Sequence, residues 1–248
     1  ILMERTLADA RRWVAHGTHV CRDAIASLDE ASFAQTCLLP GWTRKHLVAH
    51  LAANGDAVRN LATWAATGVP TPMYSSPAQR SSDIEAGSQY AGSALTAWFD
   101  RSAQGLQEAW DGLSASAWQA PVVTAQGRTV PASETPWMRA REVLVHAVDL
   151  GTGVTFADLP SDFLEALGDD ITTKRGAAPM ADSPVVEICP TDAAGVRWTL
   201  PGSDPSTPIT VAGPLAACTA YLAGRGDAGL TASRDGERTP IPSLAAWL

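Results

Sequence analysis

The chain has 248 residues, and its 26 acidic side chains outnumber the 18 basic ones, which gives a formal net charge of −8 at pH 7. An acidic chain of this kind does not resemble a basic nucleic-acid binder, so we expect no nucleic-acid partner. Hydrophobic residues make up 46% and charged residues 18%, a composition too apolar and too weakly charged for intrinsic disorder. These values predict a globular protein with one large domain or two small ones.

The cysteines and the apolar segments indicate the cellular context. Four cysteines are scattered along the chain, without a Cys-x-x-Cys pair and far below the density of a disulfide scaffold: Cys21, Cys37, Cys189 and Cys218. Charged residues interrupt every apolar stretch near the N-terminus, so we expect no signal peptide. No run approaches the roughly 18 apolar residues that a membrane span requires. The sequence therefore predicts a cytoplasmic protein without a membrane partner.

The first 150 residues show the periodicity of helices, because apolar positions recur at intervals of three and four. Four helices are predicted, at about 3–28, 43–68, 82–113 and 136–151. Thr43 is a good N-cap for the second helix, Gly68 ends it, and Pro136 suits the first turn of the fourth. The connections at 69–81 and 114–135 are long for a compact helical domain, which is typical of loops that cover a site.

After Gly153 the composition changes. One further helix is predicted at about 161–175, followed by three short runs rich in β-branched residues at 185–188, 196–200 and 209–211, and a last helix at 215–223. This pattern predicts an α+β protein, with a helical domain over residues 1–153 and a small α+β domain over residues 154–248. We expect the two domains to join near residues 151–160.

The fourth helix carries a narrow polar stripe. At 100° per residue, Glu142, His146 and Asp149 fall within about 60° of one another, and the surface on both sides of them is apolar. Because a helix that is apolar almost all round is buried, its carboxylate and imidazole need partners. A metal ion is one such partner; a core ion pair and a solvated surface stripe are the alternatives.

A third candidate ligand lies on the second helix. His50 points within the same sector as Leu47 and Leu51, which belong to the core-facing side of that helix. Two histidines and one glutamate leave coordination positions open on zinc or another divalent metal, which is typical of a catalytic site and not of a closed structural one.

Several segments resemble one known family over nearly the whole chain. They are Leu39-Pro40-Gly41-Trp42-Thr43 followed by His50, the stretch 124–135, the helix with Glu142 and His146, and Ala223-Gly224-Arg225-Gly226. Together they resemble the mycothiol-dependent maleylpyruvate isomerases. The resemblance implies a DinB-like four-helix bundle followed by a small C-terminal domain.

The resemblance also implies an activity and a set of site residues. In this family the thiol mycothiol serves as cofactor for the cis-trans isomerisation of maleylpyruvate, a dicarboxylate, to fumarylpyruvate in aromatic degradation. By resemblance, His50, Glu142 and His146 bind zinc, and Arg225 reaches from the C-terminal domain into the cleft. Asp149 matches an acidic position of the family's site, where it either acts on the substrate or orients a ligand imidazole.

The sequence leaves open which arginine binds the substrate and what the function of the whole chain is. Arginine pairs with carboxylates through its planar fork, which makes Arg225 the first candidate for binding the substrate, with Arg128 and Arg139 behind it. The alternative is that Arg225 is only a cation at a helix end. For the function as a whole, the alternatives are another mycothiol-dependent S-transferase and a non-catalytic metal or thiol sensor. Such sensors usually use cysteine ligands, and no cysteine lies within helical reach of the three predicted ligands.

Overall fold

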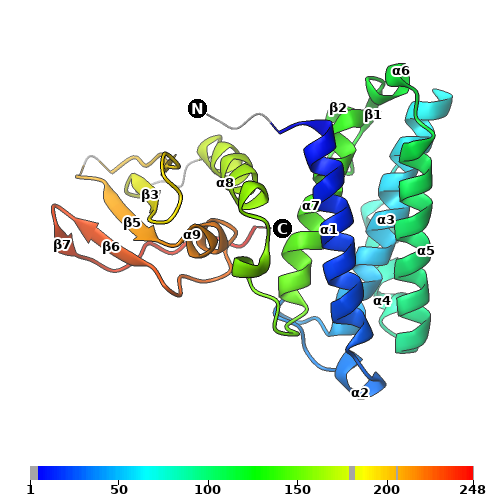
Figure 1. Cartoon of the computed structure of the whole chain (residues 1–248), viewed down its shortest axis with the longest axis horizontal. Coiled ribbons are helices and arrows are strands. Elements are labelled where there is room, and N and C mark those ends of the chain that lie inside the picture. Colours follow the sequence, from blue (N-terminus) through cyan, green and yellow to red (C-terminus); the bar gives the residue numbers. More distant parts are fainter. Residues whose placement is uncertain (1–4, 179–181, 205, 248) are drawn as a thin grey trace. The chain divides into compact units, whose positions relative to one another are not determined.

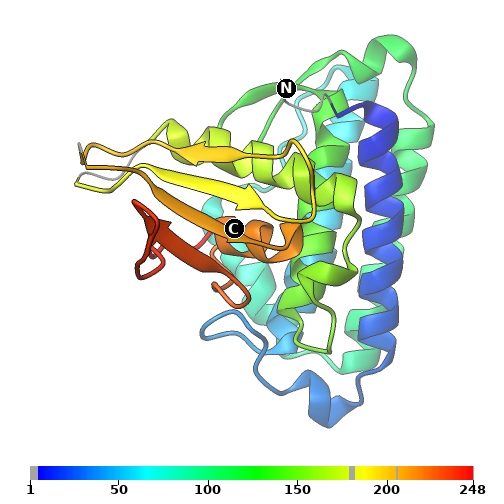
Figure 2. The same cartoon turned by 60° about the vertical axis from the view of Figure 1, so that its left-hand side comes forward.

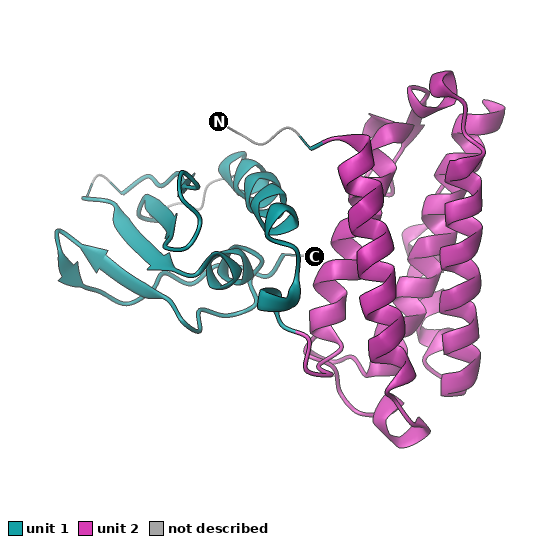
Figure 3. Cartoon of the chain, in the orientation of Figure 1, with its two compact units in different colours: residues 1–5, 155–248 teal, residues 6–154 magenta. Residues whose placement is uncertain are grey.

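The computed structural model describes residues 5–178, 182–204 and 206–247. The chain forms two compact units, which Figure 3 colours separately: unit 2 is Thr6–Val154, and unit 1 contains the chain from Thr155 onward. Unit 2 is helical and unit 1 contains a sheet, so the predicted α+β class is confirmed. Within the described residues, no helix has the length and apolar character needed to cross a bilayer.

Four long helices lie side by side in unit 2 (Figure 1). They are α1 (Leu7–Ala26), α3 (Arg44–Thr67), α5 (Gly92–Asp111) and α7 (Thr135–Asp149). Each contacts two of the others, because α1 packs on α5 and α7, and α3 also packs on α5 and α7. The predicted four-helix bundle is therefore confirmed. The first helix was predicted to begin at Met3, a position outside the described residues.

The ends of α3 lie where the sequence places them. The Thr43 hydroxyl accepts from the His46 backbone N–H, and His46 Nδ1 accepts in return from the Thr43 N–H at 3.2 Å, which completes a capping box. At the other end Gly68 adopts φ = +72°, a left-handed conformation that glycine reaches without strain. Fourteen of the 24 residues of α3 are buried, including every one from Leu47 to Gly55, so this helix is central to the bundle.

The predicted single helix over 82–113 is wrong. The chain forms α4 (Pro77–Gly87) and then, after a break, α5. Glycines at the two sides of the break allow close approaches that a longer side chain would block: a Cβ at Gly87 would lie 2.6 Å from the Cβ of Ala49, and one at Gly92 would overlap the Phe33 ring. Tertiary packing therefore overrides the helical periodicity at this point.

The predicted connection at 114–135 contains regular structure. It forms α6 (Ala115–Trp118), an antiparallel hairpin of β1 (Pro121–Val123) and β2 (Thr129–Pro131), and a 3₁₀ turn, η1 (Ala132–Glu134). Val122 faces Val130 across the hairpin and both side chains are buried, which anchors it to the bundle. The other short helix of unit 2, α2 (Glu30–Phe33), lies between α1 and α3 in the sequence.

Unit 1 holds a five-stranded sheet with two helices and a 3₁₀ turn, η2 (Phe156–Asp158). The helices are α8 (Ser161–Gly176) and α9 (Leu215–Leu222), close to the predicted ranges. The sheet has the order β4-β3-β5-β6-β7, in which only β3 and β5 are parallel neighbours. The strands are β3 (Val186–Pro190), β4 (Trp198–Leu200), β5 (Ile209–Gly213), β6 (Thr231–Arg234) and β7 (Glu237–Arg238).

One face of this sheet is covered. Buried residues alternate with more exposed ones along β3, β4 and β5, α9 contacts β3 and β5, and α8 contacts β4 (Figure 2). The approach of α8 is so close that a Cβ at Gly168 would overlap the Trp198 ring. The last two strands were not predicted, because β6 has a single β-branched residue and β7 consists of two charged ones.

Candidate metal centre

Three side chains from two helices of the bundle converge. His50 comes from α3, and Glu142 and His146 lie one turn apart on α7. One ligand atom from each lies within 4.8 Å of the other two. Glu142 Oε2 is 2.9 Å from His50 Nε2 and 3.0 Å from His146 Nε2. The structure thus brings together the three residues that the sequence predicts as metal ligands, which we call the triad.

The bundle holds the triad away from bulk water. Both imidazoles are buried, with 5% of each side chain exposed, whereas Glu142 keeps 16% of its side chain exposed. The two rings meet edge to face, with centroids 5.1 Å apart. Because buried polar groups are costly without partners, this arrangement is stable only where the nitrogens and the carboxylate satisfy one another or bind an ion.

Asp149 supports one of the two imidazoles. Its Oδ2 lies 2.8 Å from His146 Nδ1, and the residue is only 1% exposed. The carboxylate accepts the Nδ1–H, so the lone pair of the neutral ring is on Nε2, the atom that faces Glu142. A carboxylate behind a histidine is the usual arrangement at metal centres, because it fixes both the tautomer and the ring orientation.

The charges of the triad are strongly coupled. Burial alone raises the pKa of Glu142, but the two adjacent imidazoles outweigh it and hold that pKa well below its usual range. Burial lowers the pKa of His146, yet hydrogen bonds and the charges of Asp149 and Glu142 raise it to about 9. For His50 burial dominates and lowers the pKa. The site therefore keeps a carboxylate ionised at neutral pH beside two imidazoles.

The donor set fits a divalent metal ion. Two imidazole nitrogens and one carboxylate oxygen, close together and buried, suit zinc and several other divalent metals. Three protein ligands leave coordination positions for a further molecule. Within the part of the chain that the structure describes, this ligand cluster contains no cysteine. That composition matches a catalytic centre better than a thiol sensor.

Two further residues border the triad and were missed by the sequence analysis. Arg80 of α4 places Nη2 3.4 Å from His50 Nδ1, and Tyr74, just before α4, forms a hydrogen bond with Arg80. Both lie in the stretch 69–81, which was predicted to be a connection. A signal was present: Ser76 followed by Pro77 is an N-cap with a first-turn proline, which predicts the start of α4.

The two weaker arginine candidates lie in different environments. Arg139 is 1% exposed, and its Nη1 donates to the Leu51 carbonyl at 2.7 Å and to Asn54 Oδ1 at 2.8 Å. This guanidinium links α7 to α3 inside the bundle. Arg128 is exposed and lies between β1 and β2.

Comparisons with known proteins identify the family. A family model described as the mycothiol maleylpyruvate isomerase N-terminal domain matches residues 14–151. A crystal structure of the mycothiol-dependent maleylpyruvate isomerase is 40% identical, with 98% of each chain covered and a TM-score of 0.88. This chain belongs to the mycothiol-dependent maleylpyruvate isomerase family. A crystal structure of a histidine-to-alanine mutant of that isomerase is also 40% identical, with 98% of each chain covered and a TM-score of 0.87. Among curated proteins, none matches the sequence.

The prediction that the chain is an enzyme of the mycothiol-dependent maleylpyruvate isomerase family is thereby confirmed. Arg225, which the family resemblance assigns to the site, follows α9 in unit 1. Its Nη1 donates to the Ala223 carbonyl at 2.7 Å and to the Trp247 carbonyl. These contacts place its guanidinium at the end of a helix, as the alternative interpretation expects. Its role toward a substrate stays a prediction.

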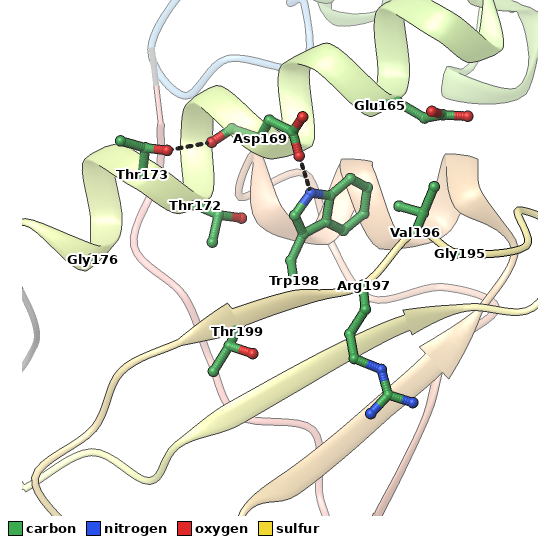
Figure 4. Close-up of a pocket in the computed structure, with 10 residues that line it drawn as sticks. All are labelled: Glu165, Asp169, Thr172, Thr173, Gly176, Gly195, Val196, Arg197, Trp198 and Thr199. Atoms are coloured by element: carbon green, nitrogen blue, oxygen red, sulfur yellow. Dashed lines mark hydrogen bonds between the residues drawn. The ribbon is translucent and has the colours of Figure 1, made fainter. Parts of the chain in front are cut away.

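Unit 1 of this isomerase-family chain also contains a cavity of about 310 Å³ between α8 and β4 (Figure 4). No predicted site residue lines it. Two of its polar groups are paired: the Trp198 indole N–H donates to Asp169 Oδ1 at 2.8 Å, and Arg197 pairs with Glu187, which lies outside the lining. Among the residues that the structure describes, no histidine or cysteine lines this cavity, so it offers no second set of ligands like that of the triad.

Proposed function

We propose that this chain converts maleylpyruvate to fumarylpyruvate with mycothiol as cofactor, at a divalent metal centre formed by His50, Glu142 and His146, with zinc as the metal. The observation that carries the proposal is the convergence of these three buried side chains in a chain 40% identical, over 98% of its length, to a mycothiol-dependent maleylpyruvate isomerase.

The reaction requires a nucleophile that adds and leaves again. The thiolate sulfur bonds to one carbon of the cis double bond, and the electron pair of that bond moves through the conjugated carbonyl to give an enolate. The former double bond is now single and rotates. The enolate then reforms the double bond in the trans geometry and the thiolate leaves, so no atom is gained or lost and no oxidant is needed.

The residues of the triad suit this chemistry. A divalent ion held there favours a thiolate at neutral pH over a thiol, whose free pKa is about 8.5. Glu142 supplies the one negative ligand, so with two neutral imidazoles the centre keeps a net positive charge of about one, which attracts an anionic sulfur. Asp149 retains the proton of His146 on Nδ1 and so keeps Nε2 directed to the centre. We therefore assign Asp149 a positioning role.

Arg225 is our candidate for binding a substrate carboxylate. A guanidinium never loses its charge near neutral pH and pairs with a carboxylate through two N–H donors. Binding the dicarboxylate while the bond rotates keeps the reacting carbons in place until the thiol leaves. Arg225 belongs to unit 1.

The test is a turnover measurement on the purified chain with its metal content determined. We expect the absorbance of maleylpyruvate to change only when both the metal and mycothiol are present, and the product to be the trans isomer by NMR. Release of a stable thiol adduct would instead show an S-transferase. Absence of any turnover in the metal-loaded protein with mycothiol would overturn the proposal.

A further inference from the structure

A guanidinium and a phenol lie next to the triad, on the side of α4. Arg80 Nη2 is 3.4 Å from His50 Nδ1, and Tyr74 forms a hydrogen bond with Arg80. Both side chains are partly exposed, unlike the buried imidazoles. Among the described residues, the contacts of the Arg80 guanidinium are these two, and neither is with a carboxylate. A cation beside a buried site without an anionic partner is unusual, because neighbouring charges normally compensate it.

The contact between Arg80 and His50 depends on the histidine tautomer. A guanidinium only donates, so His50 Nδ1 accepts from Arg80 only while the ring proton is on Nε2. A neutral imidazole that uses Nε2 as a ligand carries its proton on Nδ1. Two N–H donors would then face each other, and Arg80 would need another acceptor. His146 has no such conflict, because Asp149 accepts its Nδ1–H.

The charge of the site indicates what that acceptor is. Arg80 and the buried Arg139 carry positive charges, and Glu142 and Asp149 carry negative ones. A divalent metal ion would add positive charge beside Arg80, so an anionic acceptor is favoured there over a neutral one. A carboxylate of the substrate is such an acceptor. Arg139 is 1% exposed and its Nη1 is bonded inside the bundle, although its Nη2 has no hydrogen-bond partner among the described residues, whereas Arg80 is partly exposed. Arg80 is therefore the guanidinium of this group that a ligand can reach.

We propose that Arg80 binds one carboxylate of the substrate, with the Tyr74 hydroxyl as a second donor beside it. This inference rests on the proposed function and adds to it a carboxylate site within the bundle itself, separate from Arg225. Burial raises the pKa of Tyr74, so its hydroxyl keeps the proton that it would donate.

The experiment compares Arg80→Gln with Arg101→Gln in the metal-loaded full chain. Arg101 is an exposed residue of α5, so its replacement removes the same charge elsewhere in unit 2. Three quantities are measured: metal content, KM for maleylpyruvate and for mycothiol, and the Kd of succinate by calorimetry without thiol. Succinate is a dicarboxylate with no double bond for the thiol to attack, so it reports binding alone.

We expect Arg80→Gln to retain its metal and to raise both the KM for maleylpyruvate and the Kd of succinate about tenfold or more. Arg101→Gln should match the wild type. Arg80→Lys should be intermediate, because it keeps the charge but loses the fork. Tyr74→Phe should raise the same two constants by a smaller factor. If Arg80→Gln folds poorly, Arg80→Lys is the variant that tests the proposal. Weaker succinate binding by Arg80→Lys with full metal content supports it.

Three results would overturn it. Unchanged succinate binding in the metal-loaded Arg80 variants would show that Arg80 does not bind a carboxylate. Loss of the metal in Arg80→Gln would show that Arg80 positions His50 for metal binding and does not bind the substrate. A change confined to the KM for mycothiol would place the residue at the thiol. Failure of the proposed function is distinguishable, because wild-type protein would then not turn over maleylpyruvate, whereas succinate binding still reports on Arg80.

Discussion

His50 and His146 present the same atom, Nε2, to Glu142, but they differ at Nδ1. Asp149 accepts from His146, whereas a guanidinium faces His50. The two histidines are therefore not equivalent: one is oriented by a buried carboxylate, and the other contacts the Arg80 guanidinium and the Trp42 ring. A carboxylate fixes the ring proton on Nδ1, and a guanidinium, which only donates, does not. We expect the loss of His50 to be the hardest to compensate, because it is the one proposed ligand that does not come from α7.

Replacement of His50 by alanine should remove the metal and the activity together. Two remaining ligands, Glu142 and His146, both come from α7 and would no longer span the bundle. His16→Ala, an exposed position on α1, is the control and should keep both. Elemental analysis and turnover are the measurements. Full metal content in the His50 variant would contradict the assignment of this residue as a ligand.

The metal-free protein should lose stability as the pH rises from about 6.5 to about 9. The pKa of His146 is raised to about 9 in the folded chain, against about 6.5 when unfolded, so the folded state binds the extra proton in this window. The stabilisation is complete below pH 6.5 and disappears as the pH passes 9. The pKa of His50 is lowered, so its contribution changes below 6.5 and does not interfere.

Urea unfolding of the metal-free chain at several pH values measures this effect. Asp149→Asn should flatten the decline, because that variant removes one of the two carboxylates that raise the pKa of His146. A free energy of unfolding that stays constant between pH 6.5 and 9 would show that His146 is not protonated in the metal-free fold.

No native cysteine should be needed for catalysis, because the proposed nucleophile is an external thiol. Burial raises the pKa of Cys21 to about 12 and that of Cys218 to about 11, so neither forms a thiolate at neutral pH. Conservative replacement of all four cysteines should keep most of the turnover and the full dependence on mycothiol. Loss of activity in a single Cys→Ser variant that keeps its fold and metal would contradict the external-thiol mechanism.

The candidate site was predictable where helical periodicity places a polar side chain on a core-facing side. His50 shares the sector of Leu47 and Leu51. Glu142, His146 and Asp149 lie on one helix, so their common face follows from the 3.6-residue repeat. Arg80 has no such relation to His50, because its helix reaches the site only through tertiary packing. Sequence periodicity does not show which helices pack against each other.

At the scale of elements, the contact between α1 and α7 sets the position of the helix that carries Glu142 and His146. A Cβ at Gly17 would lie 2.6 Å from Val143 Cγ2 and 2.8 Å from Leu144 Cγ. The two helix backbones can therefore approach this closely only because Gly17 has no side chain. The sequence gives no sign of this, since glycine inside a helix ordinarily lowers its stability.

Gly17→Ala should destabilise the fold by about 1–3 kcal/mol, the usual cost of overpacking a core. Gly105→Ala is the matched control, because a Cβ there would meet only the flexible side chain of Arg59. That change should be neutral or stabilise α5 by up to about 1 kcal/mol through helix propensity. Thermal unfolding of both variants is the measurement. Equal effects would show that the α1–α7 contact has room for a methyl group.

The predictable elements are those whose signals are local. Both ends of α3 were predicted from a cap residue and a glycine, and β3, β4 and β5 from β-branched runs. The break between α4 and α5 was not, because it depends on contacts with Ala49 and Phe33 on other elements. Strands β6 and β7 have almost no intrinsic strand preference and form because β5 offers a neighbour to pair with.

At the scale of the whole molecule, the residues assigned to the reaction belong to both units. The triad, Asp149 and Arg80 lie in unit 2, and Arg225 lies in unit 1. The change in composition after Gly153 predicted two parts, and the structure divides into compact units between Val154 and Thr155.

Arg225→Ala tests whether unit 1 takes part in the reaction. If Arg225 binds a substrate carboxylate, this variant should keep its metal but lose about 2 kcal/mol of transition-state stabilisation, a decrease in kcat/KM of about 30-fold. Arg225→Lys should recover part of this loss, because it restores the charge without the fork. The guanidinium also donates to the Ala223 carbonyl at the end of α9, so a purely structural role predicts a different result. In that case the melting temperature would fall while kcat/KM at matched metal content stayed near the wild-type value, and the carboxylates of the substrate would have to be bound by unit 2 alone.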